Sequence, residues 1–124
     1  EHVRVTTLLP GYPAVIAALG DGRALRRLDD LFGGPARLRR GTAAGLDIIA
    51  LDAPHLFDRP GNPYLAPSGG EWPDNGVRFA ALGAAASLIA TGAVRGLEFD
   101  AVHAHDWQAG LAPAYLRFAA PRKP

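Results

Sequence analysis

The alternation of strand-like and helix-like segments is the feature that most constrains how this chain of 124 residues can fold. Three short apolar runs have the length and composition of buried strands, namely Val3–Leu9, Leu46–Leu51 and Ala101–His105. Helices are expected between and after them, at Ala14–Leu19, Asn75–Val94 and Asp106–Phe118. Because strands that alternate with helices form parallel sheets with helices on their faces, we predict an α/β fold with a parallel sheet.

Residues 25–51 allow two interpretations. The apolar residues of segment 25–32 recur at spacings of three and four, which favours a short amphipathic helix. Equally, Arg37–Gly41 and Leu46–Leu51 could pair as a hairpin through residues 42–45. The paired arginines at 26–27 and 39–40 are interpreted as solvated faces.

Composition excludes several classes of protein. The formal net charge of +1 argues against a nucleic-acid-binding domain, which would carry a strongly basic face. With no Cys, the chain has neither disulfides nor thiolate metal sites, which fits a reducing cytoplasm. No signal peptide is visible, and the most apolar run, Phe79–Val94, is too rich in small residues to span a bilayer. We therefore expect a cytoplasmic location and no membrane partner.

The first residue is Glu1, and a strand-like run follows almost at once. This opening without Met predicts that the sequence is a segment of a longer protein. No repeat, Gly-x-Gly-x-x-Gly loop, Walker loop or Gly-x-Ser-x-Gly elbow occurs in it.

Candidate ligand-binding residues follow the predicted strands. Ligands of open parallel sheets bind beyond the carboxyl ends of the strands, where Pro10-Gly11-Tyr12, the loop 53–71 and His105-Asp106-Trp107 are expected to converge. Asp106 either caps the following helix or accepts hydrogen bonds from sugar hydroxyls. In the Pro-rich loop, Tyr64 can stack on a sugar ring, whereas Asn62 and Asp58 are expected to form turns. Trp107 fits a core position better than a ligand platform, and Asp74 fits the N-cap of the long helix.

His103 and His105 offer a rival interpretation. Two residues apart on a strand, their side chains would share one face and could ligate a metal of a hydrolase. The His-x-His-x-Asp-His pattern of binuclear hydrolases fails here, since Trp107 and Gln108 occupy its last two positions. We therefore expect no metal site and no cofactor.

Several ordered motifs resemble those of bacterial glycogen synthases. They are Leu8-Leu9-Pro10-Gly11-Tyr12-Pro13, the run from Leu51 through His55-Leu56-Phe57-Asp58-Arg59-Pro60-Gly61-Asn62-Pro63 to Tyr64, Pro73-Asp74-Asn75, and the run from Val102 through His105-Asp106-Trp107-Gln108 to Leu116. The resemblance implies the GT-B fold, in which two Rossmann-like domains face each other across a cleft. The chain would be an incomplete Rossmann-like segment, residues 1–124, of the N-terminal, acceptor-side domain, without the C-terminal nucleotide-binding domain.

The same resemblance implies a function and a site. The family transfers glucose from ADP-glucose to the non-reducing end of an α-1,4-glucan such as glycogen, with retention. The resemblance also implies that Asp106 is catalytic and that Tyr64, His105 and Trp107 bind the substrate. Phe57 stands where relatives often carry Tyr, which puts a polar role there in doubt. Because the family's Lys-x-Gly-Gly phosphate loop is missing, we expect these residues alone to be inactive. A non-catalytic glucan-binding module that uses Tyr64 is the main alternative.

Overall fold

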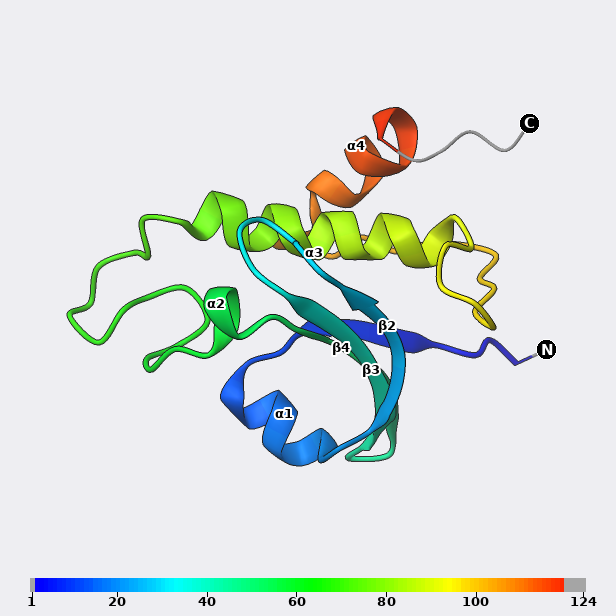
Figure 1. Cartoon of the computed structure of the whole chain (residues 1–124), viewed down its shortest axis with the longest axis horizontal. Coiled ribbons are helices and arrows are strands. Elements are labelled where there is room, and N and C mark those ends of the chain that lie inside the picture. Colours follow the sequence, from blue (N-terminus) through cyan, green and yellow to red (C-terminus); the bar gives the residue numbers. More distant parts are fainter. Residues whose placement is uncertain (1, 120–124) are drawn as a thin grey trace. The chain divides into compact units, whose positions relative to one another are not determined.

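The computed structural model describes residues 2–119, which divide into two compact units with the boundary between Glu71 and Trp72 (Figure 1). The first unit contains a β-sheet with two short helices, and the second is built from helices and loops. Among the described residues, no helix is both long and apolar enough to cross a membrane.

The sheet of the first unit is mixed. Its four strands, in the spatial order β1-β4-β3-β2, are β1 (Thr6–Pro10), β4 (Leu46–Asp52), β3 (Ala36–Ala43) and β2 (Arg23–Leu28). Strands β1 and β4 pair in parallel, with Leu8 opposite Ile49, whereas β3 pairs antiparallel with both of its neighbours. The α/β class and the parallel pairing of the first two predicted strands are confirmed, but the sheet as a whole is mixed rather than parallel. Short connections cause the difference, because a parallel pair requires a long crossover between its strands.

The β3–β4 hairpin confirms one of the two interpretations of residues 25–51. Its strands are joined through Ala44 and Gly45, whose φ angles are +49° and +75°. Positive φ at both central residues is the geometry of the tight turn that matches the twist of two antiparallel strands. Strand β4 lies between β1 and β3, and five consecutive residues of it are buried, as its unbroken apolar run predicts.

Strand β2 replaces the amphipathic helix that the spacing of residues 25–32 favoured, so that prediction is wrong. The β2–β3 register shifts between Ala24 and Arg26, so Leu25 and Arg26 together oppose Leu38. A bulge of this kind inserts one residue into a strand and disturbs its alternation. Apolar residues three apart, Leu25 and Leu28, are therefore compatible with a strand, and periodicity alone did not distinguish it from a helix.

Helix α1 (Pro13–Leu19) covers one face of the sheet, and α2 (Pro54–Phe57) follows β4 (Figure 1). The apolar core between α1 and the sheet consists of Leu19, Ile48 and Ala50, with Leu9, Val15, Ile16 and Ala43 packed against them. Between β1 and α1, the Gly11 N–H donates to the Leu51 carbonyl at 2.8 Å. A Cβ at position 11 would lie 2.6 Å from that oxygen, so only glycine permits this close approach.

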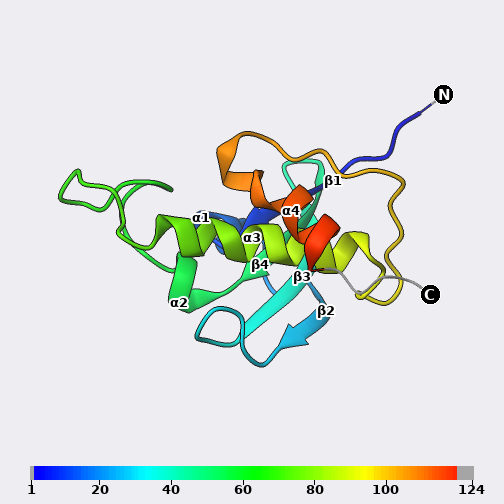
Figure 2. The ribbon, with the colours of Figure 1, turned by 90° about the horizontal axis from the view of Figure 1, so that it is seen from above.

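The second unit consists of α3 (Asn75–Ala90), the 3₁₀ turn η1 (Trp107–Ala109) and α4 (Leu111–Phe118) (Figure 2). Helix α4 packs closely on α3, because a Cβ at Gly83 would lie 3.0 Å from the Ala112 nitrogen. The predicted long helix is confirmed, although it ends at Ala90 rather than Val94. Asp74 occupies its N-cap position, but its side chain makes no capping hydrogen bond to the helix.

Two further predictions for this unit are wrong. Residues 101–105 form no strand, because a strand requires backbone hydrogen bonds to a neighbour, and an apolar sequence pattern does not supply one. The last helix does not begin at Asp106: the η1 turn comes first, and α4 starts at Leu111. Pro113 is the third residue of α4, in the first turn, where its missing N–H breaks no helical hydrogen bond.

Candidate functional site

In the first unit, the carboxyl ends of β1 and β4 meet at one edge of the sheet, as the parallel pairing requires. Pro10 is opposite Leu51 in the register, so Tyr12 and the segment that follows Asp52 emerge side by side. The rings of Tyr12 and Phe57 pack edge to face, with centroids 5.8 Å apart. Phe57 is fully buried, so in this chain the position serves packing. The sequence-based expectation that residues 10–12 and the 53–71 loop converge is confirmed for this unit.

The loop 58–71 is held by its own hydrogen bonds. The Asn62 Oδ1 accepts from the backbone N–H of Tyr64 at 2.9 Å and of Leu65 at 2.8 Å, which confirms the turn-forming role expected of Asn62. Near the loop tip, the Ala66 N–H donates to the Gly70 carbonyl at 2.8 Å. These contacts give the loop a definite local geometry. Tyr64 lies within it and is 44% exposed, as a ring that stacks on a ligand must be.

His55 anchors the start of this loop to the β2–β3 connection. Its Nε2 donates to the Leu31 carbonyl at 2.9 Å, which requires the hydrogen on that nitrogen. Gly34 lies against the same ring, since a Cβ there would be 2.6 Å from the His55 Cγ. The Arg59 guanidinium in turn donates to the His55 carbonyl at 3.1 Å. The sequence motif contains His55, but no spacing in the sequence indicates its partner Leu31, which is 24 positions away.

The ion pair at the opposite end of β4 serves structure. The Asp47 carboxylate accepts from Arg40 Nη2 and from Thr6 Oγ1, each at 2.6 Å. These hydrogen bonds, with that from Arg40 the stronger influence, lower the pKa of Asp47 to about 2. The Asp47 carboxylate is ionised, accepts two short hydrogen bonds and lies near the start of β4, whereas residues 53–71 follow its end. Such a carboxylate is poorly suited to proton transfer. We assign it to stability.

In the second unit, Asp106 has a strained backbone. Its φ is +60° and its ψ is −176°, a combination that is populated almost only by glycine. Its exposed carboxylate accepts a hydrogen bond from the Trp107 N–H at 2.7 Å, so it caps η1. The expectation that Asp106 caps a helical turn is confirmed. Because strain of this kind is rare in a non-glycine residue and clusters at functional sites, Asp106 stays a candidate ligand-binding residue.

Trp107 presents much of its ring to solvent. The indole packs edge to face against Phe79 of α3, with centroids 5.0 Å apart, and 57% of the residue is exposed. The prediction that Trp107 lies in the core is therefore wrong for this unit. An exposed indole that is fixed on one side by a buried phenyl ring has the geometry of a stacking platform.

His103 and His105 lie in the exposed segment that precedes Asp106. Their ring centroids are 6.2 Å apart and the rings are inclined by 39°. Within residues 2–119, no three His, Cys, Asp or Glu side chains are grouped so that they could hold a metal ion.

The four candidate residues are thus divided between the two units. Tyr64 belongs to the first unit, whereas His105, Asp106 and Trp107 are consecutive in the second. Their convergence on one ligand stays a prediction.

Comparison with known proteins defines the class. The family model described as the starch synthase catalytic domain matches residues 1–124, the whole chain. The chain therefore belongs to the starch synthase catalytic domain family.

Its relatives in that family are named glycogen synthases. The chain is 54% identical over 124 residues to the glycogen synthase of Methylocella silvestris, a match that covers 100% of this chain and 26% of the relative. It is 55% identical over 118 residues to that of Acidiphilium cryptum, with 95% and 25% covered. It is 56% identical over 116 residues to glycogen synthase 2 of Bradyrhizobium diazoefficiens, with 94% and 24% covered. The chain thus spans about a quarter of the length of these relatives.

Proposed function

We propose that the chain is a segment of a glycogen synthase, a hexosyltransferase that transfers glucose from ADP-glucose to the non-reducing end of an α-1,4-glucan. The observation that carries this proposal is the match of the entire chain to the starch synthase catalytic domain, together with relatives that share more than half of its residues. In this proposal the chain belongs to the N-terminal, acceptor-side domain of a GT-B enzyme in the cytoplasm. A second domain outside the chain holds the nucleotide.

The proposed reaction retains the configuration at the transferred carbon. The bond between glucose C1 and the diphosphate oxygen breaks, and a bond forms from C1 to the 4-hydroxyl oxygen of the acceptor on the same face. The hydroxyl proton passes to the departing diphosphate. Groups that stabilise the charge on this leaving group are cations or backbone N–H donors. In the proposal they come from outside these residues, so the chain contributes sugar recognition.

Asp106 is the residue proposed to act closest to the reacting sugar. Its carboxylate is exposed and held in one orientation by the Trp107 N–H, which leaves acceptor capacity for a sugar hydroxyl. His105 precedes it and is proposed to orient the segment that carries Asp106. The exposed rings of Trp107 and Tyr64 suit stacking on apolar faces of glucose units.

The decisive experiment measures ADP release by the full-length protein from ADP-glucose with glycogen as acceptor, and compares it with UDP release from UDP-glucose. The proposal expects turnover with ADP-glucose. Asp106→Asn is expected to lower kcat on the order of 100-fold, the size of effect seen when one pre-organised polar contact to the reacting group is lost. Asp100→Asn, a matched exposed carboxylate in the same segment, is expected to leave kcat unchanged. Full activity of Asp106→Asn would remove Asp106 from the catalytic site.

The isolated residues 1–124 are expected to be inactive. Orienting donor and acceptor contributes roughly 7–11 kcal/mol to catalysis in favourable cases, and this requires both walls of the cleft. Incubating the isolated chain with ADP-glucose and glycogen tests this point. Turnover within about tenfold of the full-length protein would contradict it, given that size of orientation effect. Binding of maltooligosaccharides by a full-length protein that transfers no glucose would instead support the glucan-binding alternative.

A further inference from the structure

Two arginines stand directly opposite each other on strands β2 and β3. Arg27 pairs with Arg37 in the antiparallel register, so their side chains leave the sheet on the same face. Like charges in directly opposed positions destabilise a sheet. Edge strands commonly carry charged residues, but charges that alternate in sign would serve that purpose without the repulsion. An anion bound beside both guanidinium groups would relieve this repulsion.

The acidic groups of the first unit compensate this charge only in part. The Oδ2 of Asp52, a residue only 6% exposed, accepts from Arg37 Nη2 at 3.2 Å and from Arg39 Nη1 at 3.1 Å. One carboxylate thus serves two guanidinium groups. Arg27 contacts Asp29 at 3.3 Å, but both side chains are more than 70% exposed, so solvent weakens that pair. The group formed by these three arginines and two aspartates therefore carries one positive formal charge in excess.

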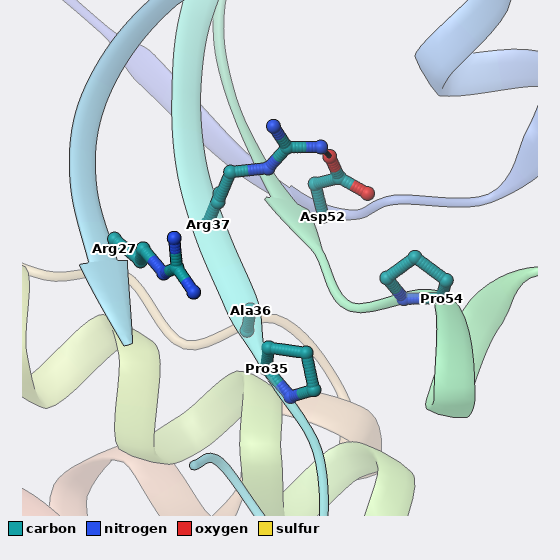
Figure 3. Close-up of a pocket in the computed structure, with 6 residues that line it drawn as sticks. All are labelled: Arg27, Pro35, Ala36, Arg37, Asp52 and Pro54. Atoms are coloured by element: carbon teal, nitrogen blue, oxygen red, sulfur yellow. Dashed lines mark hydrogen bonds and ion pairs between the residues drawn. The ribbon is translucent and has the colours of Figure 1, made fainter. Parts of the chain in front are cut away.

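A pocket lies beside the two opposed arginines. It has a volume of about 260 Å³ and is lined by Arg27, Pro35, Ala36, Arg37, Asp52 and Pro54 (Figure 3). The Arg37 guanidinium points toward Asp52, and the Arg27 guanidinium lies on the side of Arg37 that faces away from Asp52 (Figure 3). The volume is just below the roughly 300–1,000 Å³ of pockets that hold drug-sized ligands, so a small ligand fits it. Two prolines form stiff apolar walls.

We propose that this pocket, which contains none of the proposed sugar-binding residues, binds a small anion that carries a phosphate group. Phosphate suits it better than a carboxylate does, because a dianion with three terminal oxygens can accept from donors that approach it from different directions. Arg37 keeps nitrogen donors beyond the one that Asp52 uses. The arginines of residues 26–27 and 39–40 are consequently more than solvated faces: Arg39 is only 13% exposed, and Arg27 forms one wall of the pocket.

The test is a titration of the full-length protein with inorganic phosphate, followed by phosphorus NMR, in the presence of saturating ADP. ADP fills any phosphate site that belongs to the proposed nucleotide substrate. We expect one phosphate per chain, and the double variant R27Q/R37Q should weaken its binding about tenfold or more, because charge-assisted hydrogen bonds are lost. R27Q alone alters only an exposed side chain, so it reports on the site even where R37Q disturbs the fold through Asp52.

Arg23→Gln is the matched control. Arg23 lies on the same strand, is exposed and also faces an arginine, Arg40, but it is not part of the pocket. It should leave phosphate affinity unchanged. Glycerol 2-phosphate forms a second arm: tighter binding than that of inorganic phosphate identifies a phosphate monoester as the ligand, and weaker binding identifies free phosphate. Absence of phosphate binding in the presence of ADP, or equal binding by R27Q/R37Q and the unmodified protein, would overturn the proposal. Neither result depends on whether the protein transfers glucose.

Discussion

Replacing Asp106 by glycine should make the protein more stable than replacing it by alanine, although both changes remove the carboxylate. The backbone of Asp106 lies at φ +60° and ψ −176°. A non-glycine residue in this region costs on the order of 1–3 kcal/mol. Glycine relieves that strain but loses more chain entropy on folding, about 0.5–1 kcal/mol. The net advantage of glycine over alanine is therefore about 1 kcal/mol, within limits of roughly 0 and 2.5 kcal/mol.

The hydrogen bond that the Asp106 carboxylate accepts determines how stable the unmodified protein is relative to these variants. Its acceptance from the Trp107 N–H at 2.7 Å contributes roughly 0.5–1.5 kcal/mol. Alanine at position 106 keeps the strain and loses the bond, so it should be the least stable variant. Asparagine keeps both the strain and an acceptor oxygen, and should lie close to the unmodified protein. The expected order of stability is glycine above alanine, with asparagine matching aspartate.

Hydrogen exchange of the amides in residues 103–111 is the appropriate assay, because it reports local opening free energies in a protein of several units. The same preparations are assayed for glucosyl transfer. A glycine variant that is at least as protected as the unmodified protein yet inactive would show that the carboxylate is kept at this strained position for function. Equal protection of the glycine and alanine variants would refute the argument from strain. Full activity of the glycine variant would leave Asp106 with a capping role only.

Two further predictions concern stability. Gly83→Ala should destabilise the protein by about 1–3 kcal/mol, because the new Cβ would meet the backbone of α4 at 3.0 Å. Gly76→Ala in the same helix meets nothing within 4 Å and should stabilise the protein by up to about 1 kcal/mol. Chemical denaturation compares the two variants, and equal effects on stability would contradict the close packing of α3 and α4. Arg40 and Thr6 lower the pKa of Asp47 from 3.8 to about 2, so the contribution of Asp47 to folding stability is complete above about pH 5 and is lost as the pH falls toward 2. Asp47→Asn should therefore reduce the free energy of unfolding at pH 7 by about 1 kcal/mol, a value that allows for solvent around a side chain one third exposed. The variant should also lose less stability on acidification than the unmodified protein. Unfolding curves of both proteins at pH 7 and pH 3 would show parallel losses if this pair contributes nothing.

The elements predicted correctly from sequence are those whose signals are local. The apolar run Leu46–Leu51 is a buried strand, and the hairpin that contains it turns at Ala44-Gly45, where both φ angles are positive. The long α3 helix was recognisable from its length and its small residues. In each case the information lies within one element or one turn, so no knowledge of distant partners is needed.

The errors arise where the structure depends on a partner distant in sequence. The bulge in β2 exists only relative to β3, and it makes a helix-like spacing compatible with a strand. Residues 101–105 have the composition of a strand but no pairing neighbour gives them that structure. Likewise, no local pattern indicated that Asp52 would be shared between Arg37 and Arg39, or that His55 would bind Leu31.

The candidate sugar-binding residues were identifiable because their geometry is set locally. Tyr64 is positioned by an amide two residues earlier, Asn62, and the Asp106 carboxylate is positioned by the next backbone N–H, that of Trp107. Each group therefore keeps its local orientation independently of the packing of distant elements. The distance between Tyr64 and Asp106, by contrast, depends on how the two units dock, which no short motif encodes. Sequence motifs thus indicate which side chains are presented for binding, whereas the convergence of Tyr64 and Asp106 on one sugar stays a prediction that the glucosyl-transfer assay of the Asp106 variants tests.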